Sequence, residues 1–290
     1  MTGPLLSPAD LVVRREHGDL VILDATVALE APRHDGDHRS SSGRPGWEQA
    51  HIPGSRHADL LHDLSDPSAP YHFARPSAGV LAARLAERGV RDGVPVVAYD
   101  RAGGIWAARL WWLLDWLGVE AYVLDGGLSA WRAAGLPVTA TATAEHADLV
   151  PAPLRTPVVR DGRWVGREDL KRWLAEDVQA TVLCALSPEA YAGEVPTRYS
   201  RRGHIPGTGN VPARSLLGPD GRFRPEPELR RMLGDLLADP APIWLYCGGG
   251  ISAATLGLAL TVLGRDDVAL YDGSLQEWSA DPELPIELGR

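Results

Sequence analysis

The chain has 290 residues, of which 44% are hydrophobic, and a formal net charge of −9 at pH 7. This length suffices for two domains with sizeable cores, and the acidic balance argues against a surface that binds nucleic acid or an anionic membrane. With only two cysteines, the chain has neither a disulfide framework nor the ligand spacing of a zinc site.

The predicted elements alternate between strands and helices in both halves of the chain. Ser7 is placed to cap a first helix that begins at Pro8. The first half then predicts a strand, a helix, a strand, a helix and a strand over 20–23, 78–88, 95–99, 105–117 and 121–124. The second half predicts helices over 167–175, 226–237 and 251–263 and strands over 181–185, 243–246 and 268–271. This alternation is typical of an α/β fold, with parallel sheets that carry helices on both faces.

Four short motifs occur twice in the same order, so the chain is an internal repeat. The motifs of the first half begin at Leu23, Ala50, Ala98 and Leu124, and their counterparts begin at Leu183, Gly203, Leu245 and Tyr271. We therefore expect one domain over 1–138 and a second over 158–290. The segment between them, 139–157, is rich in Ala, Thr and Pro without clear periodicity and is predicted to be a linker.

Cys247 stands between an apolar strand pattern, a run of three glycines and a buried helix pattern. Ligands of parallel sheets bind at the carboxyl ends of the strands. Unpaired N–H groups at a helix start favour negative charge and therefore a thiolate. Glycines allow the N–H groups of a loop to converge on one anion. The pattern predicts a nucleophilic cysteine, and a small buried hydrophobic residue is the alternative.

These motifs resemble those of the two-domain rhodanese-type sulfurtransferases, a family that includes thiosulfate and 3-mercaptopyruvate sulfurtransferases. The resemblance covers nearly the whole chain. It rests on the His-Ile-Pro-Gly motifs at 51–54 and 204–207, on the Asp-Gly turns before Trp131 and Trp278, and on the cysteine loop. It implies two tandem rhodanese-like domains, each with a parallel sheet and helices on both faces. The first domain is expected to be inactive, because Asp100 stands in the place of the cysteine.

The resemblance implies a sulfur relay through Cys247. The thiolate takes sulfane sulfur from a small-molecule donor, becomes a persulfide, and passes the sulfur to a small thiol, cyanide or a protein thiol. Neither a metal nor an organic cofactor is implied. The N–H groups of the following loop would stabilise the anionic sulfur, and this loop consists of Gly248, Gly249, Gly250, Ile251, Ser252 and Ala253.

The loop narrows the class of donor. It carries no charge and is similar to the Cys-Gly-Ser-Gly-Val-Thr loop of mercaptopyruvate-type members, so we favour 3-mercaptopyruvate or another thiol donor over thiosulfate. Two arginines expected to bind the donor carboxylate are nevertheless replaced by Leu186 and Ala190. Arginines that could substitute are Arg198, Arg201 and Arg202, and the alternative is that these three are solvated loop residues.

Two further departures affect the expected site. In mercaptopyruvate-type members, a serine of this loop takes part in proton transfer with a histidine and an aspartate. Gly249 stands in its place here, so a Ser-His-Asp relay is not expected. The histidine that matches such a relay, His72, is therefore interpreted as a surface or interdomain residue. Cys184 stands where the first repeat has Asp24. It is either a resolving thiol that forms a disulfide with Cys247 on oxidation or a small buried strand residue.

Several repeated residues are interpreted as structural. His51 and His204 occur in both repeats, one of which lacks a nucleophile, and Asp125 and Asp272 are expected to be turn residues. Two other functions are alternatives to sulfur transfer. A phosphatase loop would need arginine at the position of Ala253, so a phosphatase is not favoured. A non-catalytic sulfur carrier or binding protein with a decayed site is the main alternative function. The amino terminus lacks a signal-peptide pattern and no apolar run could span a bilayer, so a soluble cytoplasmic protein is expected.

Overall fold

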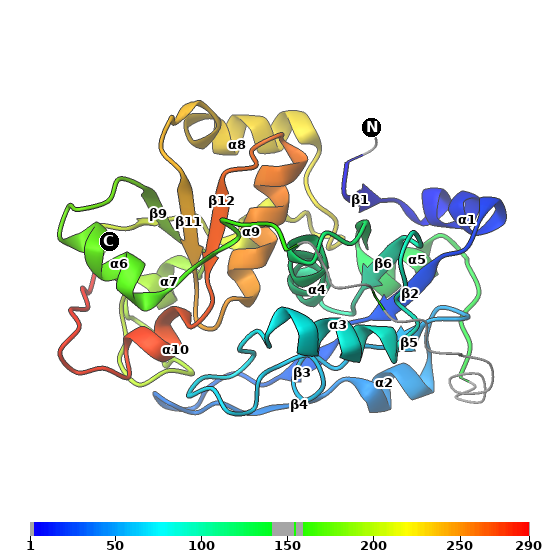
Figure 1. Cartoon of the computed structure of the whole chain (residues 1–290), viewed down its shortest axis with the longest axis horizontal. Helices are drawn as coiled ribbons and strands as arrows, with labels where there is room; N and C mark the ends of the chain where they lie inside the picture. Colours follow the sequence, from blue (N-terminus) through cyan, green and yellow to red (C-terminus); the bar gives the residue numbers. More distant parts are fainter. Residues whose placement is uncertain (1–2, 141–153, 155–158, 290) are drawn as a thin grey trace.

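Two five-stranded parallel sheets dominate the computed structural model, which describes residues 3–140, 154 and 159–289 (Figure 1). The strand order is β1-β7-β6-β2-β5 in the first sheet and β10-β9-β11-β12-β8 in the second. When the first order is read in reverse, as β5-β2-β6-β7-β1, its strands correspond in turn to those of the second sheet. This correspondence confirms the internal repeat and the α/β class. A separate antiparallel pair joins β3 (Val27–Leu29) to β4 (Ser40–Ser42).

Each sheet has its own set of helices. The first domain consists of β1 (Leu5–Leu6), α1 (Pro8–His17), β2 (Val21–Asp24), α2 (Arg44–Gln49), β5 (Arg56–His57), α3 (Ala78–Ala86), β6 (Val96–Tyr99), α4 (Ile105–Trp116), β7 (Ala121–Leu124) and α5 (Gly127–Ala133), together with β3 and β4. The second consists of β8 (Trp164–Val165), α6 (Arg167–Leu174), β9 (Thr181–Cys184), α7 (Pro188–Tyr191), β10 (Gly209–Asn210), the 3-10 helix η2 (Ala213–Leu216), α8 (Glu226–Ala238), β11 (Ile243–Tyr246), α9 (Ile251–Val262), β12 (Val268–Tyr271) and α10 (Ser274–Trp278).

The start of α1 shows how local sequence sets an element. The Ser7 side chain accepts the N–H of Asp10, and the Asp10 carboxylate accepts the N–H of Ser7 in return. Pro8 occupies the first helical position, where a missing N–H costs nothing. The predicted cap and helix start are therefore confirmed.

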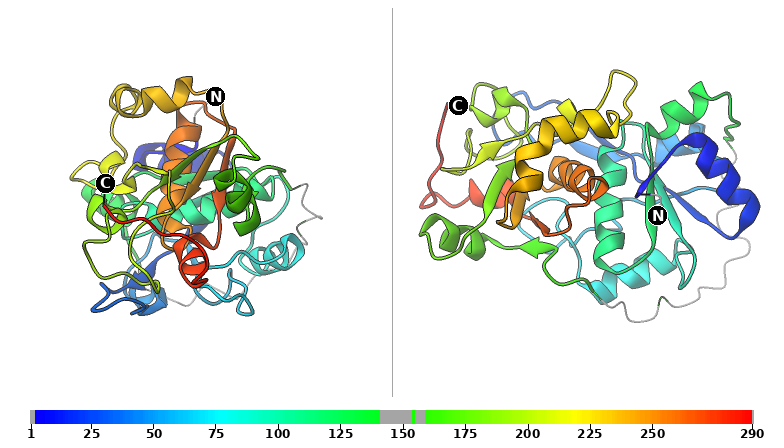
Figure 2. Two further views of the ribbon diagram at one scale, coloured as in Figure 1. Left: turned by 90° about the vertical axis from the view of Figure 1, so that its left-hand side faces the viewer. Right: turned by 90° about the horizontal axis from the view of Figure 1, so that it is seen from above.

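Alternate residues of the central strands face opposite sides of each sheet. In the second sheet, Leu183 and Leu245 belong to the core on the side of α8 and α9, whereas Val182 and Trp244 belong to the core on the side of α6 and α10. The first core continues across the domain boundary, where α4 packs against α9 (Figure 2). The two domains thus share one central core.

The two Asp-Gly segments lie in the predicted turns, and they also bind the opposite domain. The Asp272 carboxylate forms a buried ion pair with Arg109 at 2.5 Å and accepts the backbone N–H of Arg75 at 2.8 Å. Asp125, its counterpart, accepts the backbone N–H of Phe223 at 2.8 Å. These contacts fix the relative position of the domains and thus the shape of the space between them.

The long predicted elements are confirmed, with boundaries that shift by one or two residues. The two-residue edge strands β1, β5, β8 and β10 were not predicted. Of the expected linker at 139–157, residues 141–153 and 155–157 lie outside the described residues, so the division into 1–138 and 158–290 stays a prediction.

Candidate active site

Cys247 directly follows β11, at the carboxyl edge of the second sheet. Gly250 has a left-handed backbone (φ 76°) and ends the turn, and α9 begins at Ile251. Cys247 is 2% exposed and lines a cavity of about 770 Å³ to which both domains contribute side chains. Because parallel sheets bind ligands at this edge, Cys247 is placed to meet a molecule in the cavity.

Ser274 fixes the cysteine loop from the start of α10. Its Oγ accepts the backbone N–H groups of Cys247 and Gly250, both at 3.1 Å, and donates to the carbonyl of Tyr271 at 2.8 Å. Ser274 is fully buried, so these bonds are shielded from water. Sequence reasoning missed this role, and the only signal was that the first repeat has Gly127 at the matching place.

The matching loop of the first domain wraps a buried carboxyl group. The Asp100 side chain is fully buried at the end of β6, where the second domain has Cys247. Burial raises the pKa of its carboxyl, and the N–H groups around it act in the opposite direction. Both carboxylate oxygens accept two backbone N–H groups each, at 2.7 to 2.9 Å, from Ala102, Gly104, Trp106 and Ala107.

The loop of the second domain presents equivalents of two of the four donors, whereas the N–H of Gly250, which matches that of Gly104, donates to Ser274. In the repeat, Ser252 and Ala253 match two of the donors to Asp100, and both lie in the first turn of α9. The N–H groups of a first helical turn have no partner within the helix. They are therefore available to a negatively charged sulfur on Cys247.

The cavity beside Cys247 is mainly apolar. Its walls combine Phe73 and Trp106 of the first domain with Leu186 and Pro212 of the second. Leu186 and Ala190, the two replacements for expected arginines, both lie in this wall. An apolar wall suits the carbon skeleton of a ligand better than a small inorganic dianion.

The three predicted arginines lie in different places. Arg198 lines the cavity, and its Nε and Nη2 donate to the Glu30 carbonyl at 3.0 and 2.5 Å. Arg201 donates to main-chain carbonyls of the carboxyl-terminal segment, including that of Asp281. Arg202 forms an ion pair across the domains with Asp35 at 2.9 Å. Of these three predicted arginines, only Arg198 lines the cavity.

Arg214 is a cavity residue that sequence reasoning missed. It lies on η2, is exposed, and lines the same cavity as Cys247 and Arg198. Within the described ranges, no carboxylate lies within ion-pair distance of its guanidinium and no hydrogen bond engages it. The positive charge of Arg214 is nevertheless close enough to lower the pKa of Arg198, after the larger effect of burial.

Cys184 faces away from Cys247. The Cys184 side chain belongs to the same core as Tyr246, on one side of the sheet. Cys247 directly follows Tyr246 in the chain and belongs to the core on the other side. Burial raises the pKa of the Cys184 thiol to about 12. Both thiols are free. The placement of the two cysteines in different cores favours a small buried strand residue, and the resolving-thiol interpretation stays a hypothesis.

His72 and Gln276 link the domains at the rim of the cavity. The Gln276 Oε1 accepts the backbone N–H of His72 at 2.8 Å and lies 3.1 Å from its Nδ1. A Cβ at Gly249 would lie 2.5 Å from the Gln276 Nε2, so Gln276 occupies the space of a side chain at that position. His72 is exposed, which confirms it as an interdomain surface residue. Its ring stacks on that of His38, with centroids 3.6 Å apart.

The histidines of the two His-Ile-Pro-Gly motifs are structural, as predicted. The Nδ1 of His51 lies 2.8 Å from the carbonyl of Trp47, on whose ring the imidazole stacks. The Nδ1 of His204 lies 2.9 Å from the carbonyl of Tyr191, with the same stacking. Both histidines are buried and lie outside the cavity lining.

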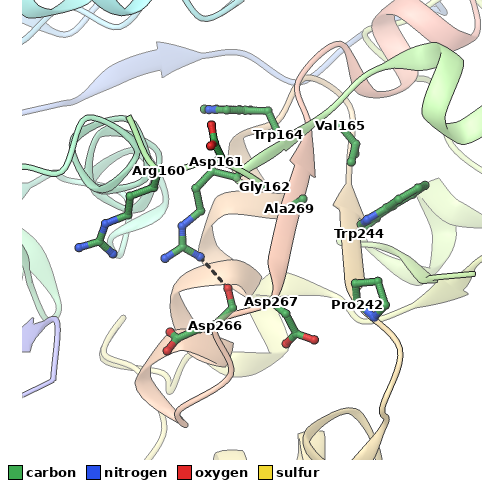
Figure 3. A pocket seen from close by; sticks show the side chains of 11 residues that line it. Arg160, Asp161, Gly162, Trp164, Val165, Pro242, Trp244, Asp266, Asp267 and Ala269 are labelled. Carbon is green, nitrogen blue, oxygen red and sulfur yellow. Dashed lines mark hydrogen bonds between the residues drawn. The ribbon is translucent and has the colours of Figure 1, made fainter. Parts of the chain in front are cut away.

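A second cavity, of about 510 Å³, opens at the opposite edge of the second sheet (Figure 3). Pro242, Asp267 and Trp164 line it, near the amino-terminal ends of β11, β12 and β8. It therefore lies away from Cys247. Across the described residues, no group of three His, Cys, Asp or Glu side chains could hold a metal ion, and no helix is long and apolar enough to cross a membrane.

Comparisons with known proteins agree with this architecture. The model of the rhodanese-like domain matches residues 7–134 and 168–281. A Pseudomonas aeruginosa protein named "Probable 3-mercaptopyruvate sulfurtransferase" is 35% identical, over 99% of each chain. The thiosulfate sulfurtransferase of Azotobacter vinelandii is 30% identical, over 98% of this chain and 97% of its own. The structure of 3-mercaptopyruvate sulfurtransferase from Leishmania major has a TM-score of 0.77 and 26% identity, over 96% of this chain and 75% of its own. The chain therefore belongs to the rhodanese family of sulfurtransferases and carries two of its domains in tandem.

Proposed function

We propose that this sulfurtransferase moves sulfane sulfur through a persulfide on Cys247. The observation that carries the proposal is the first-domain loop, in which four N–H groups hold the buried carboxylate of Asp100. Because the two loops are related by the internal repeat, the loop after Cys247 is suited to an anion in the corresponding place. A persulfide anion supplies that charge during turnover.

In the first step, the Cys247 thiolate attacks the sulfur of the donor. For 3-mercaptopyruvate, a sulfur–sulfur bond forms and the carbon–sulfur bond breaks. The electron pair stays on the methylene carbon, which takes up the proton of the donor thiol and leaves as the methyl group of pyruvate. No external oxidant is consumed, because the methylene carbon takes up the two electrons that the sulfur atoms lose when the persulfide forms.

In the second step, an acceptor attacks the outer sulfur of the persulfide. A small thiol, cyanide or a protein thiol supplies the electron pair, and the bond between the two sulfurs breaks. Cys247 regains its thiolate, so the cycle closes in two half-reactions. The N–H groups of Ser252 and Ala253 stabilise the negative sulfur between the two steps. Both cysteines of the chain are free thiols, and this chemistry suits a reducing compartment such as the cytoplasm.

The preferred donor is an organic thiol of the 3-mercaptopyruvate kind rather than thiosulfate. The loop of Gly248, Gly249 and Gly250 carries no charge to balance a dianion. The apolar wall of the cavity, which includes Phe73 and Leu186, offers contact to a carbon skeleton. Arg198 is the one predicted arginine placed to attract the charged end of such a donor.

Intact-mass measurement after incubation with 3-mercaptopyruvate, and separately with thiosulfate, tests the proposal. We expect the mass of one sulfur atom to be added to the wild type, retained in Cys184→Ala and absent from Cys247→Ser, and we expect cyanide to remove it. The first donor should load the protein at lower concentration. No added sulfur from either donor, together with an unreactive Cys247, would favour a sulfur-binding protein with a decayed site.

A further inference from the structure

Arg214 is held at the carboxyl edge of the second sheet by its backbone, while its side chain has no partner among the residues that the structure describes. The N–H of Ala213 donates to the carbonyl of Ala185, just beyond β9, at 3.1 Å. Arg224 binds the other side of η2, because its backbone N–H donates to the Leu216 carbonyl and its Nε donates to the Ser215 carbonyl. The 3-10 helix that carries Arg214 is therefore anchored on both flanks.

Two positive charges meet in the cavity without a matching negative charge from the wall. Arg198 donates its Nε and Nη2 to the neutral Glu30 carbonyl, and the nearby negative charge of Asp37 is outweighed by the positive charges of Arg214 and Arg39. Arg214 has neither an ion pair nor a side-chain hydrogen bond within the described residues. The charge of Arg214 disfavours the protonated form of Arg198, and an anion bound between the two arginines would offset this repulsion.

The position of this pair complements the lost arginines. Leu186 and Ala190 make the wall apolar where the resemblance places a carboxylate site. Arg214 enters the same cavity from η2, a different element that follows β10. We propose that Arg214, assisted by Arg198, binds the carboxylate of an organic sulfur donor whose carbon chain packs against Leu186. The inference rests on the proposed function and gives its donor a chemical class, a carboxylate-bearing thiol.

Equilibrium binding to a protein that cannot react tests this inference apart from the chemistry. In a Cys247→Ala background, calorimetry with 3-mercaptopyruvate would compare Arg214→Gln and Arg198→Gln with Arg231→Gln. Arg231 is an exposed arginine of α8 outside the cavity lining, so its replacement removes the same charge elsewhere. Loss of a charge-assisted contact should raise the Kd about tenfold or more for Arg214→Gln, with Arg231→Gln within about twofold.

The outcomes separate the two proposals. An unchanged Kd in Arg214→Gln, or an equal rise in Arg231→Gln, overturns the role of Arg214 even if the wild type forms a persulfide. A rise in the Kd for thiosulfate but not for 3-mercaptopyruvate overturns the carboxylate assignment. Conversely, a selective rise for 3-mercaptopyruvate supports the binding site even if sulfur loading of Cys247 in the wild type fails, in which case only the proposed function is rejected.

Discussion

Replacing Gly249 with alanine would reveal how tightly Gln276 packs against the cysteine loop. The new Cβ would lie 2.5 Å from the Gln276 Nε2, whereas ordinary contacts begin at 3.4 Å. The backbone of Gly249 does not have a positive φ, so alanine meets no other strain there. Gln276 must move and gives up the N–H of His72, which it accepts at 2.8 Å. We expect Gly249→Ala to lower the free energy of unfolding by about 1 kcal/mol, the usual value of one such hydrogen bond.

A double-mutant cycle with Gln276→Ala isolates this effect. Gln276→Ala alone should also cost about 1 kcal/mol, because the same hydrogen bond is lost. With the longer side chain gone, the methyl group at 249 has room, so the double variant should be no less stable than Gln276→Ala. Urea unfolding followed by tryptophan fluorescence measures all four proteins. Strictly additive losses would refute the packing argument, because they would show that the cost of the methyl group at 249 does not depend on the Gln276 side chain.

Two further predictions concern the domain interface and its pH dependence. Asp272→Asn leaves the buried Arg109 charge unpaired and should cost about 3–5 kcal/mol in urea unfolding, whereas Asp125→Asn, which faces a neutral N–H, should cost less than about 1 kcal/mol; equal losses would contradict the charge argument. Burial, followed by the nearby charges of His72 and Arg198, lowers the pKa of His38 to about 4. The folded state thus resists protonation, so stability present above the ordinary pKa of 6.5 is lost as the pH falls from 6.5 toward 4. His38→Gln should show a shallower loss of unfolding free energy over that window, and an unchanged slope would refute it.

The sequence predicts the central elements because their signal is local. The strand of residues 243–246 is apolar throughout and is buried on both faces, and the helix after Cys247 is apolar on all sides. The two-residue edge strands have no such pattern, because their pairing uses main-chain groups of a neighbouring strand. Periodicity in one segment carries no information about that neighbour.

In the candidate site too, the sequence predicts the residues that are contiguous in the chain and misses those that the fold brings together. Cys247 and its glycines are contiguous, so one motif contains them. Ser274 reaches the cysteine loop, and Arg214 reaches the cavity, from elements that only the folded sheet brings together. The roles of Asp125 and Asp272 depend on the opposite domain, which the turn chemistry of a single segment does not reveal.

The buried carboxyl group of Asp100 means that one of two related loops carries its hydrogen-bond acceptor as a permanent part of the chain. Under the proposed chemistry, the other loop acquires its acceptor only while sulfur is in transit. The loop of the first domain is thus always occupied by a side chain, whereas the loop of the second domain is occupied only while Cys247 carries sulfur. A group that is bound only in the folded state stabilises that state. The second domain would therefore be more stable while it carries sulfur than after it has passed the sulfur on, whereas the stability of the first domain would stay the same.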